Sequence, residues 1–381
     1  MFALASGRLL LLAPFVLAFG STGIAQQSAP PAGPVKQLLL VQHTLSARPW
    51  QIDAQGTAPY IDSLPFEGFT YNLPTTWDLF RGEYGAFDEA TIRGQFGSFN
   101  HTFSNLTRNF VAVVIRRRGQ GLPDGDFFDD QAWADTIAQL RVLARVAREP
   151  QYQCVGICFD PEEYFEPVWN YPDDVAYAQQ HSLAAYRDKA RQRGREFAEA
   201  LFEEWPDALI HSLHGPYLSA PERALPSAAG LTRNQVGAHD QYELLGPFQF
   251  GFLEATDLPG RVFDGGEVYQ YRSTAEFGHS YKWRTRQMGQ SVIVPPHLRG
   301  EPYESRMAVT FGLYPYSWPD PERDMMTPRI LESTLTRAYL YADDWLWVFS
   351  EASRDLLKPG GSDKSWIDAI RQGRLRADRR R

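Results

Sequence analysis

Short apolar runs and longer stretches with helical spacing alternate along most of the chain. Each short run is bounded by Gly, Pro or polar residues, which is typical of a strand buried on both faces. The runs predict eight strands, at residues 36–43, 66–72, 110–115, 154–160, 208–214, 260–269, 307–314 and 344–351. Several runs end on a polar or charged residue, so chemistry is expected at the strand ends.

The stretches between these runs carry apolar residues three or four positions apart, which predicts helices. The predicted helices cover residues 131–148, 172–204, 241–255, 273–290, 327–341 and 366–375. No Gly-rich dinucleotide or phosphate fingerprint follows the first strand, which argues against an open doubly wound sheet. Alternating strands and helices of this number, without an internal repeat, predict one (β/α)8 TIM barrel with loop insertions.

The fourth predicted strand ends in a cluster of acids and rings. Four acids lie within residues 160–166, and the aromatic residues Tyr164, Phe165, Trp169 and Tyr171 surround them. Because side chains alternate along a strand, Cys154, Cys158 and Asp160 are predicted to face the barrel lumen, with both thiols reduced. The two cysteines are about 13 Å apart at strand rise and cannot form a disulfide with each other.

The first residues resemble a targeting segment. A lone basic residue, Arg8, precedes a short apolar core and small residues up to Ala25, which predicts a signal peptide at 1–25. A Pro-rich tether at 26–34 and the catalytic barrel at 35–381 are expected to follow. The mature chain is therefore expected to begin near Gln26 and to be secreted or periplasmic, with no integral membrane segment left after cleavage.

Charge and composition narrow the class of ligand. The net charge is -8 and the pI is near 5.6, which argues against a nucleic-acid partner. Aromatic residues make up 14% of the chain, with 10 Trp and 18 Tyr. Sugar rings stack on aromatic faces, so this excess suits a carbohydrate substrate.

The carboxyl ends of the strands form the active face of such a barrel, and they supply the candidate site residues. The candidate catalytic acids are Asp160, Glu162, Glu267 and Glu351. The candidate substrate-binding residues are Asn72, Arg116, Tyr164, Trp169, His211, His214, Tyr269, Tyr271, Tyr314, Trp318 and Trp347. Gly265 and Gly266 precede Glu267, where they either allow close approach of a ligand or backbone or form a strand-end bulge.

Three short stretches resemble secreted bacterial glycoside-hydrolase-type barrels. Asp160-Pro-Glu-Glu-Tyr164 looks like the Asp-Pro-Glu or Ile-Glu-Pro-Tyr turn that ends strand four in several such families. Asp264-Gly-Gly-Glu267 and Trp345-Leu-Trp-Val-Phe-Ser-Glu351 are placed like later motifs. The resemblance implies an O-glycosyl hydrolase that cleaves a poly- or oligosaccharide with two carboxyls, without a metal or other cofactor, and Glu162 matches the Glu of the strand-four turn.

The chain departs from that family pattern at two places. It lacks the Asn-Glu pair at strand four, and it has Tyr314 where strand seven carries a Glu. The second carboxyl therefore remains open between Glu267 and Glu351.

Among these acids, Glu162 is predicted to be the general acid. A charge on Asp160 would raise the cost of ionising Glu162 and favour its protonated form. Glu267 is the favoured partner, because Tyr269 and Tyr271 can hold its carboxylate ionised by hydrogen bonds. Glu351 is the alternative partner, beside the rings of strand eight.

Two other functions share many of these residues. A metal-dependent hydrolase would use His43, His211 and His214 with Asp160, although such barrels usually open with His-x-His and 41–43 supplies half of that motif. A catalytically silent glycan-binding barrel would use the same rings and most of the acids.

Overall fold

The strands of this chain form one parallel sheet in a computed structural model. The structure describes residues 36–42, 57–77, 79–80, 87–97, 102–114, 126–162, 168–220, 242–267, 269, 271–315, 326–350, 356 and 364–380. All of them belong to one compact unit, 33–381. The predicted signal peptide and tether lie outside the described residues.

Nine strands are present in the described part of the chain. They are β1 (Gln37–Gln42), β2 (Gly68–Tyr71), β3 (Asn109–Val114), β4 (Cys154–Asp160), β5 (Leu209–Ser212), β6 (Val262–Asp264), β7 (Met307–Val309), β8 (Gly312–Leu313) and β9 (Trp345–Ser350). The order across the sheet is β7-β6-β5-β4-β3-β2-β1-β9-β8, and each neighbouring pair is parallel. Each strand overlaps one of the eight predicted runs, and only β3 begins outside its run, one residue earlier at Asn109.

The sheet closes because β7 and β8 are two parts of one interrupted strand. β7 pairs with β6, and β8 pairs with β9 on the opposite side. Between them, Thr310 N donates to Asp264 O at 2.8 Å, and Phe311 O accepts from Trp347 N at 3.2 Å. The strands therefore occupy eight positions around a barrel, and the predicted (β/α)8 fold is confirmed.

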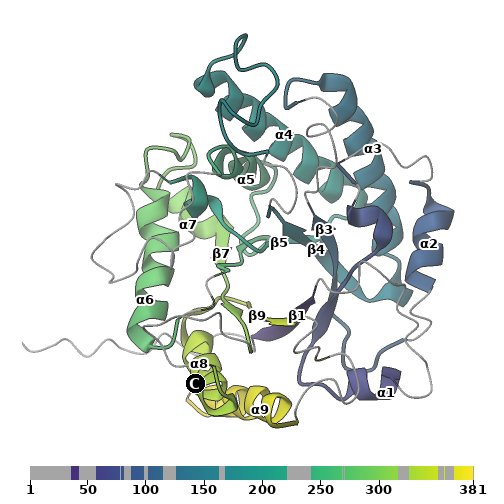
Figure 1. Cartoon of the computed structure of the whole chain (residues 1–381), viewed down its shortest axis with the longest axis vertical. Coiled ribbons are helices and arrows are strands. Elements are labelled where there is room, and N and C mark those ends of the chain that lie inside the picture. The colour runs from purple at the N-terminus through teal and green to yellow at the C-terminus, as the bar shows by residue number, and fades with distance from the viewer. Residues whose placement is uncertain are drawn as a thin grey trace, which may run out of the picture. The chain divides into compact units, whose positions relative to one another are not determined.

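Helices form the outer ring around these strands (Figure 1). They are α1 (Thr57–Asp62), α2 (Glu89–Gly97), α3 (Asp130–Ala147), α4 (Leu183–Glu204), α5 (Leu245–Glu254), α6 (Thr274–Lys282), α7 (Glu301–Arg306), α8 (Pro328–Tyr341) and α9 (Lys364–Asp378). A π-helical turn, Trp283–Gln287, continues α6. No helix among the described residues is long and apolar enough to cross a membrane.

Helix α4 begins later than its apolar pattern predicts. The predicted helix covers 172–204, but residues 171–180 form turns and α4 starts at Leu183. Ser182 caps it, because its side chain accepts a hydrogen bond from Ala185 N at 3.3 Å. The prediction of helix at residues 172–182 is therefore wrong.

The barrel has two hydrophobic cores, one inside the strands and one under the helices. The inner core consists of Leu39, Val41, Phe110, Cys158, Leu213, Phe263, Ala308, Trp345 and Trp347. These side chains fill the lumen, so a ligand reaches the barrel only above them, at the strand ends.

The prediction that both cysteines face this lumen is right for Cys158 and wrong for Cys154. Cys154 packs against the outer core, while Val155 packs against the inner one. The register between β3 and β4 shifts there, since Asn109 pairs with Cys154 and Phe110 pairs with Gly156. Such a bulge breaks the simple alternation of side chains on which the prediction rested. Both thiols are free.

Helices α4 and α5 pack closely through glycine. A Cβ added to Gly194 would lie 1.8 Å from Phe248 O, so the backbone of α5 occupies that space. We expect Gly194→Ala to lower the free energy of unfolding by about 1 to 3 kcal/mol, measured by urea denaturation. Gly94→Ala is the matched control, because a Cβ there meets open space on α2. The control should stabilise by about 0.5 to 1 kcal/mol, and equal effects of the two variants would contradict the packing argument.

Candidate active site

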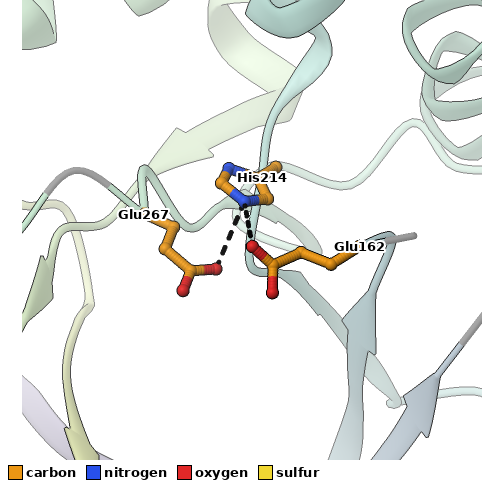
Figure 2. A group of neighbouring side chains, drawn as sticks. All are labelled: Glu162, His214 and Glu267. Carbon is orange, nitrogen blue, oxygen red and sulfur yellow. Dashed lines mark hydrogen bonds and ion pairs between the residues drawn. The ribbon is translucent and has the colours of Figure 1, made fainter. Parts of the chain in front are cut away.

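Three side chains from neighbouring strand ends meet above the inner core. Glu162 follows β4, His214 follows β5 and Glu267 follows β6. Figure 2 shows the two carboxylates turned toward the imidazole, and His214 Nε2 lies 3.3 Å from Glu162 Oε1 and 3.3 Å from Glu267 Oε2. The parallel pairing of β4, β5 and β6 brings these positions to one edge.

Local contacts hold His214 in this orientation. Its Nδ1 lies 3.2 Å from the hydroxyl of Tyr217, which belongs to the 3-10 turn Pro216–Ser219. Gly215 between them must lack a side chain, because a Cβ there would lie 2.1 Å from the Asp264 carboxyl carbon. The turn after β5 therefore fixes the imidazole against the end of β6.

Glu267 is held by its backbone and by a tyrosine. Its N donates to Leu213 O at 3.1 Å, and its Oε1 accepts a hydrogen bond from the hydroxyl of Tyr269. Its Oε2 is enclosed and accepts no hydrogen bond from any described residue; its neighbour there is His214. The predicted contact between Glu267 and Tyr269 is confirmed.

The two glycines before Glu267 make room for protein groups. A Cβ on Gly265 would lie 2.3 Å from Ser212 O, in the backbone of β5. Gly266 has φ +55, and a Cβ there would lie 2.0 Å from Arg284 Nη1. The close approach that these glycines allow is therefore that of backbone and of a buried guanidinium.

The three carboxyls of the site differ in how deeply they are buried. The Asp160 residue is 1% exposed, whereas the side chains of Glu267 and Glu162 are 10% and 31% exposed. Burial, with the charge of Glu162, raises the pKa of both Asp160 and Glu267 well above the ordinary range. Burial therefore favours the protonated form of Asp160, whereas the sequence argument for a protonated Glu162 needs a charge on Asp160.

Four predicted substrate-binding residues lie in the core. Trp169 is 0% exposed, packs on Phe248 and donates from Nε1 to Pro161 O at 2.9 Å. Tyr271 packs on Phe277 in the outer core. His211 and Trp347 are buried in the lumen. Trp169 and Tyr271 thus support the walls of the site, while the other two fill the lumen beneath it.

His211 also does not join the metal set that the sequence suggested. Its Nε2 lies 3.1 Å from Thr310 Oγ1 and its Nδ1 lies 4.0 Å from Cys158 Sγ, so both ring nitrogens face protein groups.

Some of the remaining predicted residues lie near the site, and the others lie outside the described residues. Tyr269 and Phe349 are half-buried and nearly parallel, with ring centroids 6.0 Å apart, and Tyr314 is buried beside them. Asn72 is buried directly after β2. Arg116, Tyr164, Trp318, Glu351 and His43 lie outside the described residues. Sequence reasoning missed Tyr217, whose only signal is its place three residues after His214.

Comparisons with known proteins show the fold. No family model matches the chain, and no curated protein matches its sequence. Similar solved structures include the exo-β-1,4-mannosidase Op5Man5 from Opitutaceae bacterium strain TAV5 (14% identity, TM-score 0.51, 90% of this chain and 60% of that one). A second is GH5_18 from Streptomyces cattleya in complex with Manβ1-4GlcNAc (12% identity, TM-score 0.52, 91% of this chain and 81% of that one). A third is the cold-adapted β-galactosidase from Rahnella sp. R3 (10% identity, TM-score 0.50, 90% of this chain and 56% of that one).

The chain spans 60% of the mannosidase and 56% of the galactosidase. At these identities the likeness concerns architecture alone. The chain has the (β/α)8 barrel that these glycoside hydrolases also have.

Proposed function

We propose that this protein is a glycoside hydrolase in which Glu162 and Glu267 are the two catalytic carboxyls. The observation that carries the proposal is their convergence on His214, from which each carboxylate oxygen is 3.3 Å distant. The three facing atoms all lie within 4.8 Å of one another. Glycosidases hold their carboxyls about 5 to 5.5 Å apart when they retain the anomeric configuration and about 6.5 to 9.5 Å apart when they invert it. The short spacing supports retention.

The burial of the pair supports an assignment of roles. Glu267 is the more buried carboxyl and its pKa is raised, so it is the one to hold the proton and give it to the leaving oxygen. Glu162 is the more exposed and acts as the ionised nucleophile, attacking the anomeric carbon to form a glycosyl ester. Glu267 then takes a proton from the water that hydrolyses this ester. These roles are the reverse of those that the sequence suggested.

The neighbouring rings support a carbohydrate as the substrate. Tyr269 binds Glu267 through its hydroxyl, and its half-buried ring lies almost parallel to that of Phe349, at an interplanar angle of 23°. Aromatic faces beside a catalytic carboxyl are where a sugar ring stacks. We place the sugar that is cleaved against this edge of the barrel.

The proposal is tested with Glu162→Gln, Glu267→Gln and the exposed control Glu203→Gln on α4. We expect each site variant to lose at least about 10²-fold in kcat/KM on aryl glycosides with poor leaving groups, while the control keeps its activity. With a good leaving group, Glu267→Gln should recover much of its rate and respond to azide. Glu162→Gln should remain inactive on all substrates.

The outcomes separate the alternatives. If the rate on good leaving groups recovers in Glu162→Gln and not in Glu267→Gln, then Glu162 is the general acid, as the sequence suggested. Wild-type turnover in both variants would refute the two-carboxylate proposal. Glycan binding without turnover on any substrate would identify a catalytically silent barrel.

A further inference from the structure

We infer that Glu162, His214 and Glu267 also bind one divalent transition-metal ion, with zinc as the best fit, and that this ion inhibits the enzyme. The metal-binding half stands on the geometry of the three side chains. The inhibition half rests on the proposed function, because it needs the two carboxyls to be catalytic.

Two of the three separations among the donor atoms match a zinc site. Zinc bonds of about 2.0 to 2.2 Å in a tetrahedral arrangement place neighbouring ligand atoms roughly 3.3 to 3.5 Å apart. His214 Nε2 lies 3.3 Å from an oxygen of each glutamate (Figure 2). The contact between His214 and Glu162 is also a long hydrogen bond, which a bound ion would replace. The arrangement thus corresponds to two edges of a coordination tetrahedron.

The surroundings of the three ligands also fit a metal site. A metal-binding imidazole usually engages a polar partner through its other nitrogen, and His214 Nδ1 faces the Tyr217 hydroxyl at 3.2 Å. The Tyr269 hydroxyl donates to Glu267 Oε1 and leaves Oε2 for the ion. That Oε2 is enclosed and accepts no hydrogen bond within the described part of the chain, so a cation would satisfy it.

The donor set selects the kind of metal. One imidazole nitrogen and two carboxylate oxygens suit zinc, cobalt, nickel or copper, whereas calcium and magnesium prefer oxygen ligands alone. The Glu162 side chain is 31% exposed, so the ion can enter from that side and keep an open coordination position.

Metal and sugar compete for the same oxygens. The ion would take the lone pairs of Glu162 Oε1 and Glu267 Oε2, which the proposed reaction needs for attack on the anomeric carbon and for proton transfer. Bound zinc should therefore lower kcat/KM, and a chelator should restore it.

The binding half is tested by titrating the full-length protein with Co²⁺, read from its visible absorption, and with Zn²⁺, read by calorimetry. We expect one ion per chain. His214→Gln and Glu267→Gln should abolish it, and Tyr217→Phe should weaken it about 10- to 100-fold. The control is His297→Gln. The His297 side chain is 57% exposed and pairs with Glu254, so this variant should bind the ion as the wild type does. Circular dichroism checks that each variant is folded. No uptake at millimolar metal, or equal uptake by folded His214→Gln, would refute the site.

Activity measurements keep the two proposals apart. If the protein binds the metal but cleaves no glycan, the proposed metal site is supported and the proposed inhibition is refuted. Cleavage without metal uptake would remove this inference alone. Loss of activity in chelator with recovery in zinc would show that the ion is required, which overturns both the inhibition and the metal-free reaction.

Discussion

Arg284→Met lowers the free energy of unfolding by about 3 to 5 kcal/mol, because it leaves a buried carboxylate without its counter-charge. Arg284 and Asp264 are each 1% exposed. Arg284 Nε donates to Asp264 Oδ2 at 2.8 Å, and its Nη1 donates to Thr310 O at 2.8 Å. Asp264 also accepts from Gly266 N at 3.0 Å, so the pair fixes the turn that leads to Glu267.

Urea denaturation measures this effect, with Arg141→Met as the matched control. Arg141 pairs with Glu203 at the surface, where the side chains are 36% and 62% exposed, and its loss should cost less than about 1 kcal/mol. The double variant Arg284→Met with Asp264→Asn should be more stable than Arg284→Met alone, since it removes the orphaned charge. Equal stability of the single and double variants would show that the ion pair does not support this turn.

Burial of His211 makes the free energy of unfolding fall by about 1.4 kcal/mol per pH unit as the pH is lowered from about 6.5 to 3, a contribution opposite in sign to those of the buried carboxyls Asp160 and Glu267. His211 is 0% exposed in the lumen, and burial lowers its pKa from 6.5 to about 3. In this pH window the unfolded chain binds a proton at His211 and the folded chain does not. Through this residue, acid therefore stabilises the unfolded state relative to the folded one.

The measurement compares the unfolding free energy of wild type and His211→Gln between pH 4 and pH 7 in urea. The unfolding free energy of wild type minus that of the variant should fall by about 1.4 kcal/mol per pH unit as the pH is lowered, whatever the stability of the variant at pH 7. His297→Gln removes an exposed histidine and should keep the slope of the wild type. Parallel curves for His211→Gln and wild type would mean that the buried imidazole does not titrate as its burial requires.

The strands could be predicted because a strand of a barrel is buried on both faces. Nearly all of its residues are therefore apolar, and it appears in the sequence as a short apolar run. Two details of the fold could not be predicted from the apolar runs. Cys154 changes face because of a register shift against Asn109, which no property of its own strand reveals. The start of α4 depended on the Ser182 cap rather than on the apolar pattern that precedes it.

The meeting of Glu162 and Glu267 at one end of the barrel could be predicted from the sequence, but the details of this candidate site could not. Strand order alone brings Glu162, His214 and Glu267 to one edge. The burial that raises the pKa of Asp160 depends on the whole barrel, so no property of the strand-four turn itself reveals it. Arg284 comes from a π-helical turn about 20 residues after Asp264, and only the folded chain shows that it reaches the end of β6. Trp347 resembled a sugar platform, but it fills the lumen and donates to Gly265 O at 2.8 Å.

The pairing of β1 with β9 has a consequence for the order of events during synthesis. The first strand of the barrel pairs along its full length with the last one, from Gln37 with Trp345 to Gln42 with Ser350. About 300 residues separate these two strands in the chain. At roughly 5 to 20 residues per second, β1 leaves the ribosome about 15 to 60 s before its partner exists. Throughout that interval one edge of β1 presents unpaired amides and carbonyls, so the nascent chain must be shielded from pairing with other chains until β9 has been made.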